Sequence, residues 1–377
     1  MEFLQIYKSI RNKIGLKQVL IFLGIQLFVI FIPGLLIVEL FGCLIAVNIA
    51  IFCILYFTVK RLSSIVGTSI QTFASRISME SSKLIQDKPS GLKNLDLICY
   101  MNSVIQALAS SNHLIKMLKT LQQYTQNTEN VLDIFIELLT DVNNSRSNVD
   151  HNSKLLLKLI DKIEWQKFDQ QDAFDFLSKI MSSIQKEVEN IKGDEIEIPL
   201  KTKMIYIFKG IEMKNQVQYH FGIPIGLFGD FSNFPGVKLE DLINSYFDPV
   251  TIDDEPSKTS QIYFCKEAPT ILLLHIQANK WDNDQQKMIK PEYYIQYHHK
   301  LGLNLKISDD LGKEIKEGET NYELCAVVHH MGNISSGHYV VYRKCSTIWY
   351  LLSDEQVSQV KFDCDVCPYL LIFEKTD

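Results

Sequence analysis

The chain has 377 residues, 46% of them hydrophobic, which is enough for a large buried core and exceeds one average domain. Its formal net charge of −6, with no extended run of Lys and Arg, argues against a nucleic-acid partner and suits a basic ligand better. Eight cysteines are scattered without the spacing of a disulfide framework, so we expect a reduced domain that faces the cytosol.

The N-terminal region predicts a membrane anchor. A basic segment, 1–18, precedes an apolar run, 19–59, in which Glu39 is the single formal charge. This run is too long for the core of a signal peptide, lacks a clear cleavage site, and exceeds a buried soluble helix. Pro33 and Gly34 divide it, so one span and a bent hairpin both remain open. Basic residues flank both ends, and the positive-inside rule therefore selects no orientation.

The rest of the chain reads as a linker followed by one α+β domain. Residues 60–90 are Ser-rich and form a juxtamembrane linker, and 91–377 form the catalytic candidate. Helical patterns come first and β patterns follow, which predicts helices beside an antiparallel sheet. We expect helices at 99–110, 112–125, 129–142, 153–163 and 170–190, a surface loop at 143–153, and strands that include 204–208, 217–225, 260–264, 270–276, 322–330, 338–343, 348–352 and 369–374.

The most specific pattern begins at Gly91. A polar turn leads into a helix whose apolar positions 101, 104, 105 and 108 share one buried face. Cys99 falls in the first turn, where backbone N–H groups and the helix dipole favour a thiolate, although a lone cysteine is more often a small buried hydrophobic residue. The segment GLKNL at 91–95, followed by CYMNS at 99–103, resembles the cysteine box of the ubiquitin-specific proteases.

A second motif supplies a base. A nucleophilic cysteine needs a base, a group that orients this base, and donors for the oxyanion. In SSGHYVVY, at 335–342, His338 is the first residue of a predicted strand, which is a rigid site for an imidazole. A lone histidine there is usually structural, but YEL at 322–324 with GHYVVY at 337–342 resembles the histidine box of the same family. His329 and His330 are expected to be structural, with a place beside the cleft open for one of them.

The resemblance implies three further catalytic residues. Asn94 matches the oxyanion-hole asparagine of the family. In WYLLSD, at 349–354, Ser353 stands where the family usually has the Asp that orients the histidine, and Asp354 keeps the second carboxylate. A serine oxygen can accept the ring N–H but stabilises an imidazolium less than a carboxylate does, so we expect lower or more substrate-dependent activity. Serine at this position, together with an N-terminal anchor, resembles the family member of the mitochondrial outer membrane.

The residues just before Cys99 depart from the family. Asp96, Leu97 and Ile98 replace the common Gly-Asn-Thr. The loss of Gly removes backbone freedom beside the oxyanion hole, and the charge of Asp96 can raise the pKa of the thiol. Both changes predict reduced activity.

A third box suggests the substrate. In QQDAFDFL, at 170–177, Asp172 and Asp175 are three residues apart and therefore share a helix face, which in isolation fits a solvated acidic surface equally well. The resemblance to the family's Gln-Gln-Asp-Ala box makes these carboxylates candidates to bind the arginines of ubiquitin's Arg-Leu-Arg-Gly-Gly tail. Gln171 and Tyr339 are assigned to the same substrate-binding group.

The resemblance extends over nearly all of 91–377, because APTILLLH at 268–275 and YLLIFE at 369–374 match core strands of the family. Many members hold zinc with two Cys-x-x-Cys pairs, but 190–265 contains no such pair. Cys364 and Cys367 form a single pair without two further ligands nearby in sequence, so we expect no metal or other cofactor.

Together these patterns predict a membrane-anchored thiol protease with a papain-like helical thumb, a β palm and β fingers, which hydrolyses the isopeptide bond after ubiquitin's C-terminal glycine. Its expected partners are ubiquitin, ubiquitinated membrane-associated proteins, and lipid through 19–59. The mitochondrial outer membrane is the expected location and the endoplasmic reticulum the alternative, with the catalytic domain in the cytosol. Two alternatives stay open: a weak or inactive relative that tethers ubiquitin at a membrane, and a ubiquitin-like modifier as the substrate.

Overall fold

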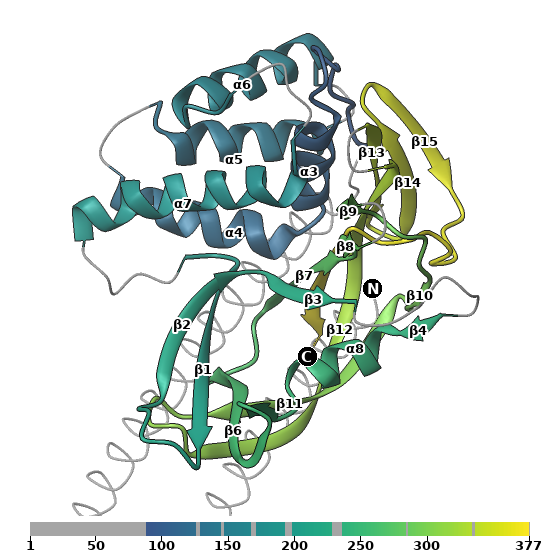
Figure 1. The fold of residues 1–377 in the computed structure, drawn as a ribbon. Helices are drawn as coiled ribbons and strands as arrows, with labels where there is room; N and C mark the ends of the chain where they lie inside the picture. Colours follow the sequence, from purple (N-terminus) through teal and green to yellow (C-terminus); the bar gives the residue numbers. More distant parts are fainter. Residues whose placement is uncertain are drawn as a thin grey trace, which may run out of the picture. The chain divides into compact units, whose positions relative to one another are not determined.

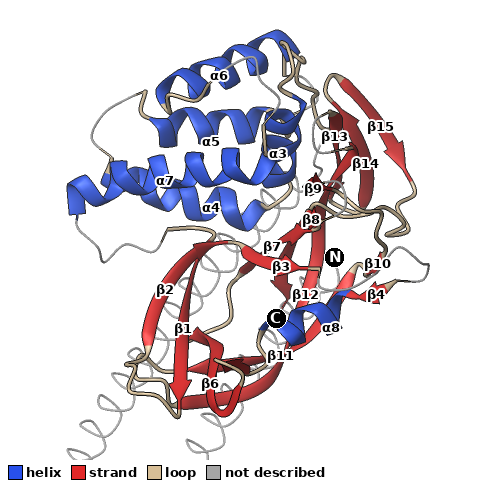
Figure 2. Cartoon of the chain, in the orientation of Figure 1, coloured by secondary structure: helices blue, strands red, loops and turns tan. Residues whose placement is uncertain are grey.

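The computed structural model describes residues 88–376 except 126–128, 145–146, 167–170, 193–197, 228–235, 284–285 and 334–335. The predicted basic segment, the apolar run and most of the linker lie outside the described residues. No helix within the described part of the chain is long and apolar enough to cross a membrane. Figures 1 and 2 show a group of helices packed beside a long curved sheet.

Helices make up the first half of the described chain, as the sequence predicted. Their bounds agree with the expected ones to within a few residues, except that the fourth begins at Val149 rather than at 153. The side chain of Asn148 caps this helix by accepting a hydrogen bond from the N–H of Asp150, so the expected loop at 143–153 is shorter. The helices are α3 Cys99–Ala109, α4 Asn112–Leu121, α5 Val131–Asp141, α6 Val149–Lys162 and α7 Ala173–Lys192, with a 3₁₀ turn at Gln122–Tyr124.

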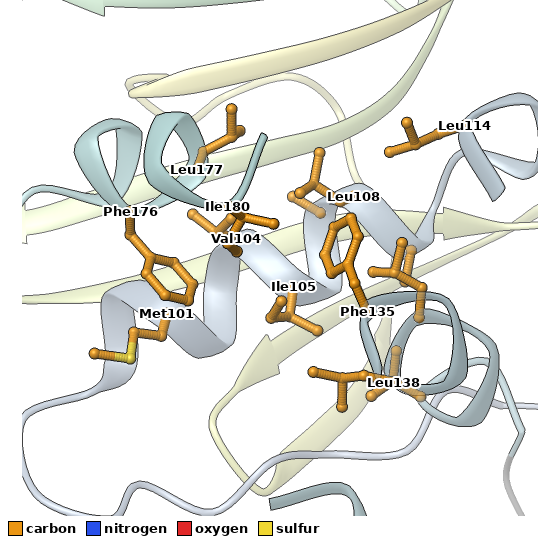
Figure 3. Close-up of a cluster of buried hydrophobic side chains, with 14 of the residues drawn as sticks. Met101, Val104, Ile105, Leu108, Leu114, Phe135, Leu138, Phe176, Leu177 and Ile180 are labelled. Carbon is orange, nitrogen blue, oxygen red and sulfur yellow. The ribbon is translucent and has the colours of Figure 1, made fainter. Parts of the chain in front are cut away.

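Helix α3 is the centre of the helical layer. Every residue of this helix is buried, because α5 and α7 pack against it from one side and strands β12 and β13 from the other. The predicted apolar face is confirmed, and Figure 3 shows its side chains meeting those of neighbouring helices. The residues labelled there are Met101, Val104, Ile105, Leu108, Leu114, Phe135, Leu138, Phe176, Leu177 and Ile180. Burying a side chain of this size stabilises the fold by about 1.5–3 kcal/mol, so Cys99 begins a rigid element.

The second half of the described chain is mainly β. Twelve of its strands form one sheet, in which β15, β14, β13, β12, β11, β6, β1 and β2 follow one another and β12 also pairs with β16. These strands are β1 Lys201–Lys209, β2 Gln216–Phe221, β3 Ile223–Gly226, β5 Val250–Ile252, β6 Glu255–Cys265, β7 Ile271–Gln277, β11 Lys300–Ser308, β12 Glu314–Gly332, β13 Gly337–Cys345, β14 Ile348–Ser353, β15 Gln356–Val360 and β16 Leu370–Thr376. Short ladders join β4 Val237–Lys238 to β10 Ile295–Gln296, and β8 Lys280–Asp282 to β9 Lys287–Ile289.

Two features of the sheet differ from the sequence prediction. The expected strand at 217–225 is broken at Gly222, whose φ of +76° belongs to the left-handed region, and the chain continues as β3. Strand β3 pairs with β7 in parallel, and β11 pairs with β6 in parallel, so the sheet is mixed rather than purely antiparallel. The α+β arrangement of helices followed by strands holds. A short helix, α8 Leu239–Tyr246, lies within the β half.

Candidate active site

Cys99 is the first residue of α3 and is 4% exposed. Burial, and then the charge of Asp354, raise the pKa of its thiol, while backbone hydrogen bonds from Tyr339, Tyr100 and Cys99 itself act in the opposite direction. The position at the helix start predicted a stabilised thiolate, but burial outweighs it. A thiol whose pKa is raised in this way needs a base to become a nucleophile.

A histidine is available on the strand that packs against α3. His338 is the second residue of β13, one position further along the strand than expected, and precedes Tyr339, whose backbone reaches Cys99. The ring Nε2 lies 2.8 Å from the Oγ of Ser353, the last residue of β14. Because Nε2 is used in this way, Nδ1 is the ring nitrogen that remains to exchange a proton with a thiol.

Asp354 lies in the tight turn between β14 and β15, and its carboxylate ties that turn to the loop before Cys99. Its Oδ2 accepts from the Nδ2 of Asn94 at 3.0 Å, and its Oδ1 accepts from the Nδ2 of Asn102 at 2.7 Å. The same Oδ2 is 4.0 Å from the Nε2 of His338. Ser353 is therefore the group in hydrogen-bond contact with the histidine, and Asp354 mainly holds two asparagines.

The predicted oxyanion residue is fixed at both ends of its amide. Besides donating to Asp354, Asn94 accepts from the backbone N–H of Ile98 through Oδ1, at 3.1 Å. The chain before Asn94 also packs tightly against the turn that carries Asp354. A Cβ at position 91 would lie 2.5 Å from the carbonyl oxygen of Glu355, so only glycine fits there. One N–H of the Asn94 amide is used by Asp354, so one is left to donate.

The loop between Asn94 and Ile98, which this hydrogen bond closes, has a strained backbone. Asp96 has φ of +88° and Leu97 has φ of +52°, so two consecutive residues other than glycine take left-handed backbone conformations. Such a conformation costs about 1–2 kcal/mol for each residue with a side chain. The expected effect of the Asp96 charge on the thiol is not seen, because Asp354 is the carboxylate that raises the pKa of Cys99.

Part of the predicted tail-binding group lines one cavity of about 440 Å³. Gln171, Asp172 and Tyr339 border it, whereas Asp175 does not. Asp172 caps α7 rather than sharing its face, because its Oδ1 accepts from the backbone N–H groups of Phe174 and Asp175. Its Oδ2 accepts from the hydroxyl of Tyr369. Burial, and then the charge of Asp172, raise the pKa of Asp175.

The cavity also contains residues that the sequence patterns did not single out or that we expected to be structural. Burial lowers the pKa of His275 to about 4, and its ring stacks on Phe174 with centroids 4.3 Å apart. Burial and the charge of Lys290 lower the pKa of His330 to about 4. The Lys290 ammonium lies 3.0 Å from the Nδ1 of that neutral histidine and donates to its carbonyl oxygen at 2.6 Å. His330 therefore lines the cavity, and it is the histidine of the pair 329 and 330 for which the sequence left a place beside the cleft open.

One group of side chains in the described part of the chain has the spacing of potential metal ligands. Glu137 and Asp141 on α5 and His151 on α6 have side-chain ligand atoms within 4.8 Å of one another, and none of the three lines the cavity. Cys364 and Cys367 join no group of three such ligands among the described residues. Cys99 lies on the helix that packs against the strand of His338, an arrangement compatible with nucleophilic catalysis by a thiol with a histidine base.

Comparisons with known proteins agree with this geometry. Residues 90–373 match the family Ubiquitin carboxyl-terminal hydrolase. Human Ubl carboxyl-terminal hydrolase 18 is 22% identical over 299 residues, which cover 74% of this chain and 80% of that protein. Ubiquitin carboxyl-terminal hydrolase 15 of Saccharomyces cerevisiae is also 22% identical, over 74% of this chain but only 24% of its own length. A structure of the SAGA Ubp8/Sgf11/Sus1/Sgf73 DUB module bound to ubiquitin aldehyde matches with a TM-score of 0.62 at 18% identity, over 78% of this chain and 71% of that one.

The family match, together with a fold shared with that structure, places the chain among the cysteine hydrolases. The family match covers most of the chain, and the chain therefore belongs to the ubiquitin carboxyl-terminal hydrolase family. It is a cysteine-type deubiquitinating enzyme, and the resemblance drawn from the cysteine and histidine boxes is confirmed at the level of the family.

Proposed function

We propose that this enzyme hydrolyses the isopeptide bond after the C-terminal glycine of ubiquitin, with Cys99 as the nucleophile and His338 as the base. The observation that carries the proposal is the 2.8 Å contact between the Nε2 of His338 and Ser353, on a strand whose next residue reaches Cys99 through its backbone. The ring is held by a neighbouring side chain and has its second nitrogen available, as a base for a buried thiol must.

The proposed reaction has two halves. The Nδ1 of His338 takes the proton of Cys99, and the thiolate attacks the glycine carbonyl while the N–H of Asn94 donates to the oxyanion. The imidazolium returns the proton to the leaving lysine amine, and the C–N bond breaks to give a thioester. Water, deprotonated by the same imidazole, then attacks the thioester, which releases the ubiquitin carboxylate and restores the thiol.

We assign the orienting role to Ser353 and a scaffolding role to Asp354. The serine oxygen can accept the Nε2–H and so keep Nδ1 unprotonated before the reaction. Asp354 acts one step away, because its bond to the Asn94 side chain holds the oxyanion donor in place. This division departs from the family's usual pair of carboxylates, and it predicts that the two residues fail in different ways when they are mutated.

The cavity of about 440 Å³ is the proposed channel for the ubiquitin tail. Gln171 and Tyr339 line it, and Asp172 presents a carboxylate at its edge that can accept from an arginine of the tail. Asp175, in the first turn of α7, offers a second carboxylate outside the cavity.

We further propose that residues 19–59 anchor the enzyme, at the mitochondrial outer membrane or alternatively at the endoplasmic reticulum. The support is the length and apolarity of that run in the sequence. Deletion of 1–59 should give a protein that still cleaves a ubiquitin C-terminal amide but no longer sediments with membranes. Imaging of the tagged full chain beside markers of both organelles separates the two locations, and a diffuse signal would refute the anchor.

Two other functions have specific support. The buried thiol with its raised pKa and the strained loop favour a weak enzyme that mainly holds ubiquitin. The name of the human relative, Ubl carboxyl-terminal hydrolase 18, favours a ubiquitin-like modifier. Turnover of C-terminal coumarin amides of ubiquitin and of ubiquitin-like modifiers by the full chain tests all three functions. The proposed function requires turnover of the ubiquitin amide that Cys99→Ala abolishes.

A further inference from the structure

Leu97 combines two properties that rarely occur together. Its side chain is 50% exposed although it is large and apolar. Its backbone lies in the left-handed region, with φ of +52°, which is a genuine outlier for a residue of this size. Asp96 before it is also exposed and left-handed, with φ of +88°. Strained residues persist where the surrounding structure fixes them, and they concentrate at functional sites.

The conformation is imposed by the two ends of the loop. Ile98 is 3% exposed, and its N–H is held by the side chain of Asn94. Leu95 packs against the core of the helical layer. Between these fixed points, the side chains of Asp96 and Leu97 are both exposed. The loop therefore presents a carboxylate and an isobutyl group to solvent just before the nucleophile.

The position of this pair relative to the cavity decides which part of a substrate it can meet. The cavity is lined by residues of 171–172, 275–279, 290, 293, 330, 339 and 369, and by no residue of 94–98. A carbonyl held at Cys99 has an acyl side and a leaving-group side. Because the loop directly precedes the nucleophile and does not line the cavity, it is free to meet the leaving-group side when the acyl side fills the cavity.

We propose that Leu97 and Asp96 form a subsite for the segment that leaves, which rests on the function proposed above. Leu97 packs against an apolar side chain next to the modified lysine, and Asp96 attracts a basic group in the same segment. The substrate class is therefore a protein whose modified lysine lies in an apolar and basic stretch. The pair then sets specificity for the target, whereas the cavity recognises the modifier.

The test uses the full chain in detergent and substrates that share one acyl group. Ubiquitin is joined to a small coumarin amine, to the lysine of a peptide with Leu and Arg neighbours, or to the lysine of a matched peptide with Ser and Glu neighbours. The variants are Leu97→Asn, which suits a left-handed backbone but loses the apolar group, and Leu97→Met, which keeps it. Leu311→Asn is the matched control, because Leu311 is 84% exposed in the turn between β11 and β12.

For Leu97→Asn we expect kcat/KM on the Leu/Arg peptide to fall about five- to tenfold more than on the coumarin amide, mainly through KM, as for the loss of one partly buried leucine. Leu97→Met should restore most of that loss, and Leu311→Asn should show no such difference between substrates. Asp96→Asn should weaken cleavage of the Leu/Arg peptide at low salt and less so at high salt.

The outcomes distinguish failure of the subsite from failure of the proposed function. Equal losses on the peptide and coumarin substrates for Leu97→Asn would show that Leu97 acts only by shaping the loop, and would overturn the subsite. A parent enzyme that cleaves the coumarin amide and both peptides, but does not discriminate between the two peptides, would overturn the subsite as well. A parent that cleaves no ubiquitin substrate would overturn the proposed function, and the subsite with it.

Discussion

Removal of the hydroxyl at 353 is the sharpest test of how the histidine is held. In Ser353→Ala the Nε2 of His338 loses its partner at 2.8 Å. The bond matters most when the ring carries a charge, and a hydrogen bond to a charged group contributes about 1.5–3 kcal/mol. That range corresponds to a loss of roughly 10- to 150-fold in the rate of the chemical step. The fold should be unaffected, because within the described part of the chain the serine hydroxyl bonds to the histidine alone.

The companion variant Asp354→Asn should fail differently. Its new amide would turn an N–H toward the N–H of Asn94 or Asn102, both of which now donate to the carboxylate. Asn102 is buried, and a buried donor left without an acceptor costs about 1–3 kcal/mol, so we expect a lower melting temperature together with a lower rate. The assay is single-turnover cleavage of a ubiquitin C-terminal amide, with thermal unfolding of each variant alongside. Parent-like rates for both variants would refute the assignment of both residues.

Further tests concern Cys99 and His275. Cys99→Ala should abolish turnover of ubiquitin amides while ubiquitin binding, measured by titration, stays near the parent level; residual turnover near the parent rate would exclude this nucleophile. Because burial raises the pKa of the thiol, alkylation of Cys99 by iodoacetamide in His338→Ala should be slow at neutral pH and accelerate above the ordinary cysteine pKa of about 8.5; peptide mass spectrometry showing a rate independent of pH would contradict this. The pKa of His275 is lowered to about 4, so the neutral ring contributes fully to the free energy of unfolding above the unfolded pKa of about 6.5. As pH falls toward 4 this contribution is lost, by up to about 3 kcal/mol. Denaturant unfolding at several pH values should show the loss in the parent and a smaller loss in His275→Phe.

The helix that carries the candidate nucleophile could be predicted from sequence because its signals are local. The apolar spacing after Cys99 identified a buried helix, and the two boxes identified the family and suggested the nucleophile and the base that we propose. Helix and strand bounds were less certain, because caps such as Asn148 and the break at Gly222 depend on single residues. A strand such as β11 had a clear alternation of leucines at 301, 303 and 305 that could have identified it.

The links between distant parts of the chain could not be predicted. Asp354 bonds to an asparagine 260 positions earlier in the sequence, and only the packing of β14 against α3 makes that contact possible. The increase that burial causes in the pKa of the Cys99 thiol likewise depends on the whole surrounding structure. The stabilisation of a thiolate expected at a helix start depends on a single turn. Residues such as Lys290 join the cavity through a similar approach of distant strands.

We propose that Cys99 is a reactive nucleophile directed at the C-terminus of ubiquitin. This proposal is tested most directly by exposing the full chain to ubiquitin that carries a C-terminal electrophile and locating the adduct by mass spectrometry. We predict one covalent adduct, on Cys99, that disappears in Cys99→Ala and forms more slowly in His338→Ala. No adduct with a correctly folded parent chain, or an adduct on any other cysteine, would contradict the account.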